Sequence, residues 1–287
     1  MLERLAPRSL ARRFFGKAIL VQRRGNGEKM VVKQIPFEGM DHSQVAEAIG
    51  EVKALKLLVH PNIVRYRGCF ISSGGRVLPD DPVTYWEKMD SGIRQTGTPP
   101  PAPAPDMLNI ITEYVDGGSL DDLLRRNAAA PLEELLIAMW LAQLVLAVDQ
   151  VRPAPECHPK SQPKPRPSEA ASEADCPLAC CRLLCQMHKS GTLHRDLKPA
   201  NIFITRSGIV KVGDLGGCVM VENLEDPIES EYGSPIFICP EVWQSSVCSH
   251  KSDVWSLGCI VYMLMAQRPP FEGHGAAVRA SCKAMAG

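Results

Sequence analysis

The stretch HRDLKPAN, residues His194–Asn201, is followed thirteen residues after its last position by DLG, residues Asp214–Gly216. The residues between the two motifs read as a pair of short strands. Such a pair would bring Asp196, Asn201 and Asp214 to one end of a hairpin. Carboxylate and amide oxygens are ligands that Mg²⁺ accepts, and a further carboxylate can orient a hydroxyl and take its proton. Phosphoryl transfer from ATP needs such a cluster.

The composition is that of a folded protein with a substantial core. The 287 residues are 45% apolar, and 32 Lys and Arg balance 32 Asp and Glu, giving a formal net charge of zero. Proteins that bind nucleic acid over an extended surface usually carry a basic excess. The longest strongly apolar run, Leu257–Met265, is too short to cross a bilayer. We expect no nucleic-acid partner and no membrane insertion.

The N-terminal residues and the cysteines each leave an alternative open. The first fifteen residues are rich in Arg and poor in acids, as in transit peptides, yet they run into a strand-like segment without a spacer. The 11 cysteines accompany no secretory signal, so we expect reduced thiols in the cytosol. Cys176, Cys180, Cys181 and Cys185 lack the paired spacing typical of zinc sites, which favours buried or incidental thiols over a metal site.

The order of expected elements predicts an α+β fold with a small β-rich first lobe and a larger, mainly helical second lobe. We place the first lobe at residues 1–113 and the second at 114–287. Apolar spacing predicts a helix over 43–58, capped by Asp41 or Ser43. The remaining expected elements are strands at 18–22, 30–35, 63–71, 108–114, 202–205 and 209–212, and helices on either side of residues 151–175.

Two segments interrupt this pattern. Residues 72–106 and 151–175 are rich in Pro and Ser and lack apolar periodicity. Proline fixes φ and removes a backbone donor, so we expect neither segment to form a sheet or a helix of any length. We interpret both as surface insertions or disordered loops, the second of which interrupts a helical pattern.

HRDLKPAN followed by DLG closely resembles the catalytic and metal-binding loops of eukaryotic protein kinases. On that resemblance Asp196 is the catalytic base and Lys198 steadies the transferred phosphate. Asn201 and Asp214 are the implied magnesium ligands. A lysine two residues after the aspartate is typical of the serine/threonine class. The resemblance therefore implies a bilobal kinase that transfers the γ-phosphate of ATP to Ser or Thr of protein substrates.

The first lobe carries further matches to this family in the expected order. Lys33 matches the lysine that grips the α- and β-phosphates, and Glu51 matches its ion-pair partner. Taken singly, each is an ordinary surface charge; their order and spacing favour the functional interpretation. The residues implied to surround the nucleotide are Gly16, Ala18, Val31, Thr112, Glu113, Val115 and Phe203. Of these, Glu113 and Val115 would bind the adenine through backbone groups.

The segment after DLG resembles the peptide-binding region of kinases. Residues 233–235 and 239–241 bracket it, and Ser230 resembles an activation-loop phosphorylation site whose phosphate would pair with Arg195. An ordinary exposed loop serine is the alternative. Asp253 resembles the aspartate that binds the catalytic-loop backbone.

Similarity at residues 15–21, 60–66, 194–204 and 251–259 favours the NIMA-related kinases. That family implies a cytoplasmic protein, with association to the cytoskeleton or centrosome implied by resemblance only.

Three departures from the family pattern keep alternatives open. Where kinases have a G-x-G-x-x-G loop, residues 11–16 read ARRFFG, so only Gly16 remains of the glycines that let a backbone approach phosphates. Leu215 replaces the usual Phe of DFG, a mild change. The sequence ends at Gly287, before further helices and a partner for Glu241, so we expect poor stability. A pseudokinase or scaffold without catalytic activity is therefore the alternative.

Overall fold

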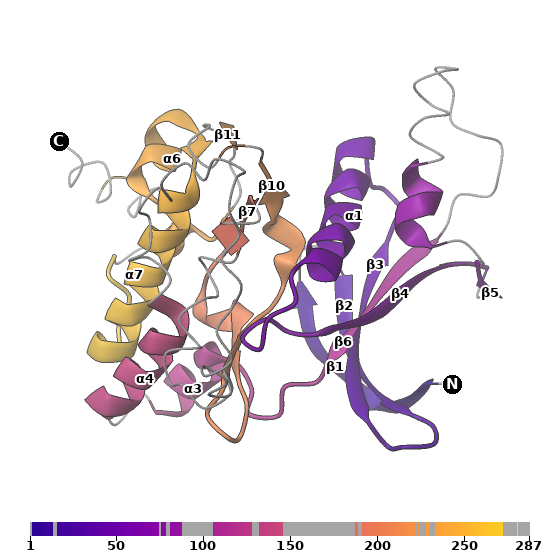
Figure 1. Ribbon diagram of the computed structural model, residues 1–287, viewed down its shortest axis with the longest axis horizontal. Helices are drawn as coiled ribbons and strands as arrows, with labels where there is room; N and C mark the ends of the chain where they lie inside the picture. Colours follow the sequence, from indigo (N-terminus) through magenta and orange to yellow (C-terminus); the bar gives the residue numbers. More distant parts are fainter. Residues whose placement is uncertain are drawn as a thin grey trace, which may run out of the picture.

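A computed structural model describes residues 2–13, 16–74, 76–78, 81–87, 106–127, 132–145, 187–188, 191–221, 223, 228–229, 233–271 and 280. The chain forms a β-rich lobe and a mainly helical lobe, which lie side by side (Figure 1). One core of buried apolar residues runs through both lobes, from Ile35 of the sheet to Ile260 of the helical lobe. The predicted α+β, bilobal fold is confirmed.

The first lobe is built on a six-stranded antiparallel sheet with the order β1-β2-β3-β6-β4-β5. Its strands are β1 (Leu2–Arg13), β2 (Gly16–Arg23), β3 (Lys29–Pro36), β4 (Tyr66–Ser73), β5 (Arg76–Val77) and β6 (Met107–Glu113). In the register of the sheet, Ala18 lies opposite Lys33 and Val31 lies opposite Thr112. The predicted strands are present, although the one expected at 63–71 begins only at Tyr66.

Helix α1 (His42–Leu57) carries Glu51 and packs against the sheet. Asp41 is its N-cap: the Asp41 side chain accepts a hydrogen bond from the Gln44 amide, and the Gln44 side chain accepts one from the Asp41 amide. This reciprocal pair satisfies two donors at the helix start. Of the two predicted caps, Asp41 is therefore correct.

The segment 72–106 does form regular structure, contrary to our expectation. Its described residues include the end of β4, strand β5 and a short helix at 82–87. Pro82 occupies the first helical position, where its missing N–H breaks no helical hydrogen bond. The Asp81 carboxylate accepts hydrogen bonds from the Val83 and Thr84 amides at 3.2 and 3.4 Å. Capping by Asp81 explains why a proline starts this helix instead of preventing it.

The second lobe contains helices α3 (Leu120–Arg126), α4 (Glu134–Val145), α6 (Pro240–Ser245) and α7 (His250–Ala266). Its short elements are β7 (Thr192–Leu193), η2 (Pro199–Asn201), β8 (Ile202–Ile204), β9 (Val210–Val212), η3 (Leu215–Gly217), β10 (Val219–Met220), β11 (Ile228–Glu229), η4 (Pro235–Phe237) and β12 (Val247–Cys248). In the described part of the chain, no helix is both long and apolar enough to span a membrane. The segment 151–175 lies outside the described residues.

Candidate active site

The hairpin of β8 and β9 positions the two motifs, as their spacing predicted. Asn201 ends the turn before β8, and Gly213 follows β9. The Gly213 amide donates a hydrogen bond to the Asn201 carbonyl at 2.9 Å. The catalytic-loop motif and DLG therefore meet at one end of the hairpin.

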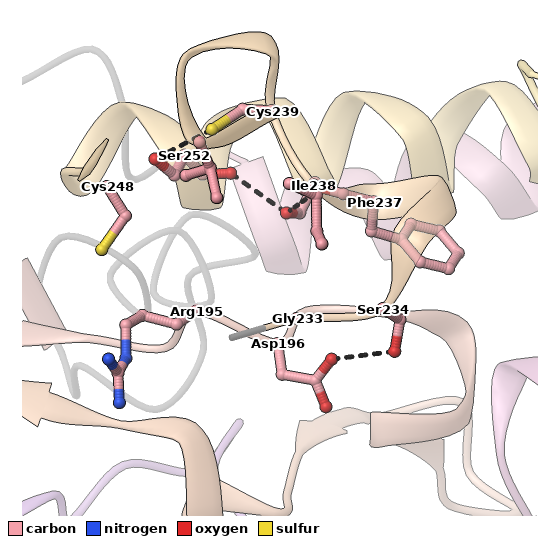
Figure 2. Close-up of a pocket in the computed structure, with 11 residues that line it drawn as sticks. Arg195, Asp196, Gly233, Ser234, Phe237, Ile238, Cys239, Cys248 and Ser252 are labelled. Carbon is pink, nitrogen blue, oxygen red and sulfur yellow. Dashed lines mark hydrogen bonds between the residues drawn. The ribbon is translucent and has the colours of Figure 1, made fainter. Parts of the chain in front are cut away.

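The Asp196 carboxylate is the centre of a hydrogen-bonded cluster and is 8% exposed. Its Oδ2 accepts from Lys198 Nζ at 2.5 Å and from Asn201 Nδ2 at 3.2 Å. Its Oδ1 accepts from Ser234 Oγ at 3.0 Å, as Figure 2 shows. Lys198 Nζ also donates to Ser234 Oγ at 2.8 Å. Sequence reasoning placed Ser234 only within the peptide-binding segment and missed this direct contact with the predicted base.

Asp253 of α7 holds the backbone of this loop, as the resemblance implied. Its carboxylate is 1% exposed and accepts from the amides of His194 and Arg195, both at 2.9 Å. His188 Nε2 lies 3.0 Å from the same carboxylate. Burial alone would raise the pKa of Asp253, but the hydrogen bond to His188 and the neighbouring His194 hold that pKa below its usual value. Arg195, whose amide makes one of these bonds, adopts the left-handed conformation with φ 63°.

Lys33 joins the sheet to α1 and to DLG. Its Nζ lies 2.9 and 2.7 Å from the two carboxylate oxygens of Glu51, and 2.7 Å from Asp214 Oδ1. Glu51 is 3% exposed. Burial would lower the pKa of Lys33, but the two carboxylates outweigh it and raise that pKa above its usual value. The predicted partner Glu51, 18 residues from Lys33, and the predicted metal ligand Asp214, 181 residues from it, thus both contact Lys33.

DLG continues into a short turn beneath α1. Asp214 has a left-handed backbone, φ 58°. Leu215 is 0% exposed and belongs to the main core. Leucine therefore fills the place of the usual phenylalanine with another buried apolar side chain. A Cβ on Gly216 would lie 3.2 Å from Glu51 Oε2, so glycine keeps this turn close to the ion pair.

The residues implied to surround the nucleotide lie on β2, β3 and β6, in the segment after β6, and on β8. Glu113 Oε1 accepts from the Arg65 amide and from Lys211 Nζ, both at 2.8 Å, so its side chain links β6 to β9. Val115 is 9% exposed. Phe203 lies against Gly213: a Cβ added there would be 3.0 Å from the ring. Sheet register places the other members, Ala18, Val31 and Thr112, on β2, β3 and β6.

Gly16 has a structural requirement of its own. Its φ is +133°, and a Cβ would lie 2.1 Å from the Gln34 carbonyl oxygen of β3. Close packing against β3 is therefore sufficient to require glycine at this position, apart from any role in binding phosphate. Around it, β1 pairs with β2, with Arg13 opposite Gly16.

A small pocket separates the Asp196 cluster from the start of α7. It is lined by Arg195, Asp196, Gly233, Ser234, Phe237, Ile238, Cys239, Val242, Cys248, Ser252 and Ser256 (Figure 2). Glu241 is exposed at the start of α6. Ser230 and the cysteines at 176, 180, 181 and 185 lie outside the described residues.

The donor set suits a magnesium ion bound together with phosphates. Asn201 and Asp214 offer an amide and a carboxylate, and Mg²⁺ is commonly held by one or two carboxylates plus substrate phosphate oxygens. Among the residues that the structure describes, no three His, Cys, Asp or Glu side chains form a self-sufficient metal cage. A site that takes part of its coordination from a nucleotide fits both observations.

Comparison with known proteins gives the family. The sequence matches the protein kinase domain over residues 12–153 and 175–286; residues 154–174, inside the expected second insertion, are left out. Serine/threonine-protein kinase Nek4 of Mus musculus is 26% identical over 92% of this chain and 25% of its own length. G2-specific protein kinase fin1 of Schizosaccharomyces pombe is 29% identical over 91% of this chain and 30% of its own length. Serine/threonine-protein kinase Nek2 of Homo sapiens is 27% identical over 90% of this chain and 44% of its own length.

The chain thus spans less than half the length of these relatives, and they agree with the resemblance to the NIMA-related kinases. The match of the domain covers most of the sequence, including every residue of the Lys33 and Asp196 clusters. The chain therefore belongs to the protein kinase domain family.

Proposed function

We propose that this chain transfers the γ-phosphate of Mg-ATP to Ser or Thr hydroxyls of protein substrates. The observation that carries the proposal is the three-way contact of Lys33 with Glu51 and Asp214, all at 2.7–2.9 Å. It requires α1, the sheet and DLG to be in place at once. Kinases need this lysine–glutamate pair and the aspartate together for catalysis.

Each side chain has a defined task in this proposal. Lys33 binds the α- and β-phosphates, and the backbone of Glu113 and Val115 binds the adenine. Asn201 and Asp214 hold Mg²⁺, which neutralises negative charge on the phosphates. Phosphoryl transfer depends mainly on positioning and charge stabilisation, so contacts that hold these residues in place contribute to the rate.

Asp196 is the base that orients the substrate hydroxyl and accepts its proton. An ionised carboxylate has about four acceptor sites. Lys198, Asn201 and Ser234 occupy three of those of Asp196. Among the residues that the structure describes, one acceptor site on Oδ1 therefore stays available for a substrate hydroxyl. Lys198, fixed beside Asp196, stabilises the charge of the phosphoryl group during transfer.

The test is transfer of labelled phosphate from Mg-ATP to a library of Ser- and Thr-containing peptides. Asp196→Asn should lower kcat by about 10³-fold, because general base catalysis contributes about 10²–10⁴-fold. It should leave the unfolding midpoint unchanged. A matched thermal scan records the rise in midpoint with Mg-ATP and its loss in Asp214→Ala. Binding without transfer in the unaltered chain would contradict the kinase proposal and support the scaffold alternative.

A further inference from the structure

The short helix at 82–87 lies beside α1 (Figure 1). Asp81 Oδ1 pairs with Lys56 Nζ at 2.7 Å, near the end of α1. Glu87 Oε1 pairs with Lys53 Nζ at 3.0 Å, one turn earlier. The rings of Trp86 and His42 meet at the start of α1, with centroids 4.8 Å apart. The two helices therefore run antiparallel, with contacts at both ends of α1.

These contacts fall on one face of α1, opposite the face that carries Glu51. An α-helix turns by about 100° per residue, so His42, Lys53 and Lys56 lie within about 60° of one another around its axis. Glu51, nine residues after His42, lies about 180° from it. Ile49 lies between these residues on the same face and is 3% exposed, whereas His42 and Lys56 stay exposed at its ends, so the centre of this face is covered. The short helix thus presses on the back of α1, and Glu51 projects from the front towards Lys33.

Apolar packing dominates this contact. The two ion pairs are partly exposed, with Lys53 and Lys56 both at 37%, and pairs of that kind contribute little. Val83, Tyr85 and Trp86 are partly buried against the core cluster to which the buried residues of α1 belong. Trp86 has the largest of these side chains, and its ring contacts His42 at the start of α1. Trp86 is therefore the main contact residue.

Asp81 couples the two helices in a second way. One of its oxygens pairs with Lys56, and the other accepts from the Val83 and Thr84 amides. The carboxylate that caps the short helix is thus also bound to α1. Formation of the short helix and its docking against α1 are favoured together.

We propose that residues 81–87 form a brace that holds α1 in place from behind and keeps Glu51 against Lys33, with Trp86 as the main positioning residue. The inference rests on the proposed kinase activity for its effect on rate. Without the brace, α1 would shift away from the sheet and Lys33 would keep only Asp214. The sequence assigns no such role to this segment, which lies on the far side of α1 from the nucleotide residues.

A double-mutant cycle tests whether Trp86 acts through Glu51. Trp86→Ala should lower kcat about tenfold, and Glu51→Gln about a hundredfold, at saturating Mg-ATP well below the melting temperature. In Glu51→Gln, adding Trp86→Ala should cost less than about twofold more, because the paired position is already lost. Trp86→Phe, which keeps a ring against His42, should restore most of the activity. A full tenfold loss in the Glu51→Gln background would overturn the proposal.

The matched control is Trp255→Ala in the second lobe, where Trp255 stacks on Phe271 with centroids 6.0 Å apart. It removes an equally large side chain away from α1, so any loss of kcat should be the same in both backgrounds. If Trp86→Ala does not fold, Lys53→Ala combined with Lys56→Ala takes its place. That variant removes both ion pairs and should give about a threefold loss with the same dependence on Glu51.

A readout independent of activity separates the brace from the kinase proposal. Labelling of Lys33 by an amine-reactive reagent, followed by peptide mass spectrometry, should rise in Trp86→Ala and in Glu51→Gln. It should stay unchanged in Trp255→Ala. Should the chain transfer no phosphate, this measurement still decides the question: equal Lys33 labelling with and without Trp86 would contradict the brace.

Discussion

The two halves of the active site are held in different ways. In the second lobe, Asp196 and its neighbours sit on a loop whose amides bind Asp253, a carboxylate that is 1% exposed. In the first lobe, Lys33 and Glu51 stand on a strand and a helix, and the Lys33 side chain is 19% exposed. The Asp196 half is fixed by short hydrogen bonds to the backbone, and the Lys33 half is fixed by the position of a whole helix. We therefore expect the Asp196 half to tolerate distant changes that disturb the Lys33 half.

Removing Asp253 should have the largest effect, because it breaks the half that is fixed by backbone. Asp253→Ala leaves the buried amides of His194 and Arg195 without their acceptor, which should cost about 3 kcal/mol of unfolding free energy. It should also lower kcat, because the left-handed backbone of Arg195 then loses the hydrogen bond from its amide to Asp253. Urea denaturation measures the first effect. Asp253→Asn keeps one acceptor oxygen, so its unfolding free energy should lie between those of the unaltered chain and Asp253→Ala. An unfolding free energy of Asp253→Ala equal to that of the unaltered chain would show that other contacts hold the loop.

Gly16→Ala tests the sheet that carries the other half. The added Cβ would lie 2.1 Å from the Gln34 carbonyl at a φ of +133°, so β2 and β3 must separate. The expected cost is about 2 kcal/mol, with a raised KM for ATP as Lys33 shifts. Gly25→Ala is the control, since its φ is +114° but nothing lies within 4 Å of the added Cβ. That variant should cost about 1 kcal/mol and leave KM unchanged. Equal KM values for the two variants would contradict this reasoning.

Ser234→Ala should have a smaller effect and sharpen the picture of the Asp196 cluster. The change removes one donor to Asp196 and one acceptor of Lys198. We expect kcat to fall about fivefold, equivalent to about 1 kcal/mol, with little change in stability. Steady-state kinetics with a peptide substrate measure it. Ser234→Thr keeps the hydroxyl and should behave like the unaltered chain; a loss as large as that of Ser234→Ala would show that shape, not the hydroxyl, matters there.

The smallest expected effect is the pH dependence of the Asp253 contribution. The folded-state pKa of Asp253 lies below its usual 3.8. A carboxylate with a lowered pKa stabilises the fold above its unfolded-state pKa, and that stability is lost as pH falls through the folded-state pKa. The difference in unfolding free energy between the unaltered chain and Asp253→Asn should therefore shrink as the pH falls below about 4. A difference that stays the same from pH 5 to pH 3 would contradict the assignment.

The two halves also differ in how far the sequence predicted them. Asp196, Asn201 and Asp214 lie within 19 positions, and the short strands between them bring them together, so local pattern was enough. The Lys33–Glu51 pair was inferred only from order and spacing, because nothing local shows which face of α1 meets the sheet. The 82–87 helix was missed because Pro82 and the Pro-rich composition favoured a loop, while its stability depends on Asp81 and on packing against α1. Ser234 was missed as a partner of Asp196 for a similar reason, since 38 residues separate them.

The position of Trp86 has a consequence for inhibitor design. A compound that displaced Trp86 from His42 would release α1 without entering the nucleotide site. It would lower kcat at any concentration of ATP, and the high ATP level of a cell would not weaken it. Because it would recognise the contact between residues 81–87 and α1, its selectivity would come from a segment outside the shared catalytic motifs.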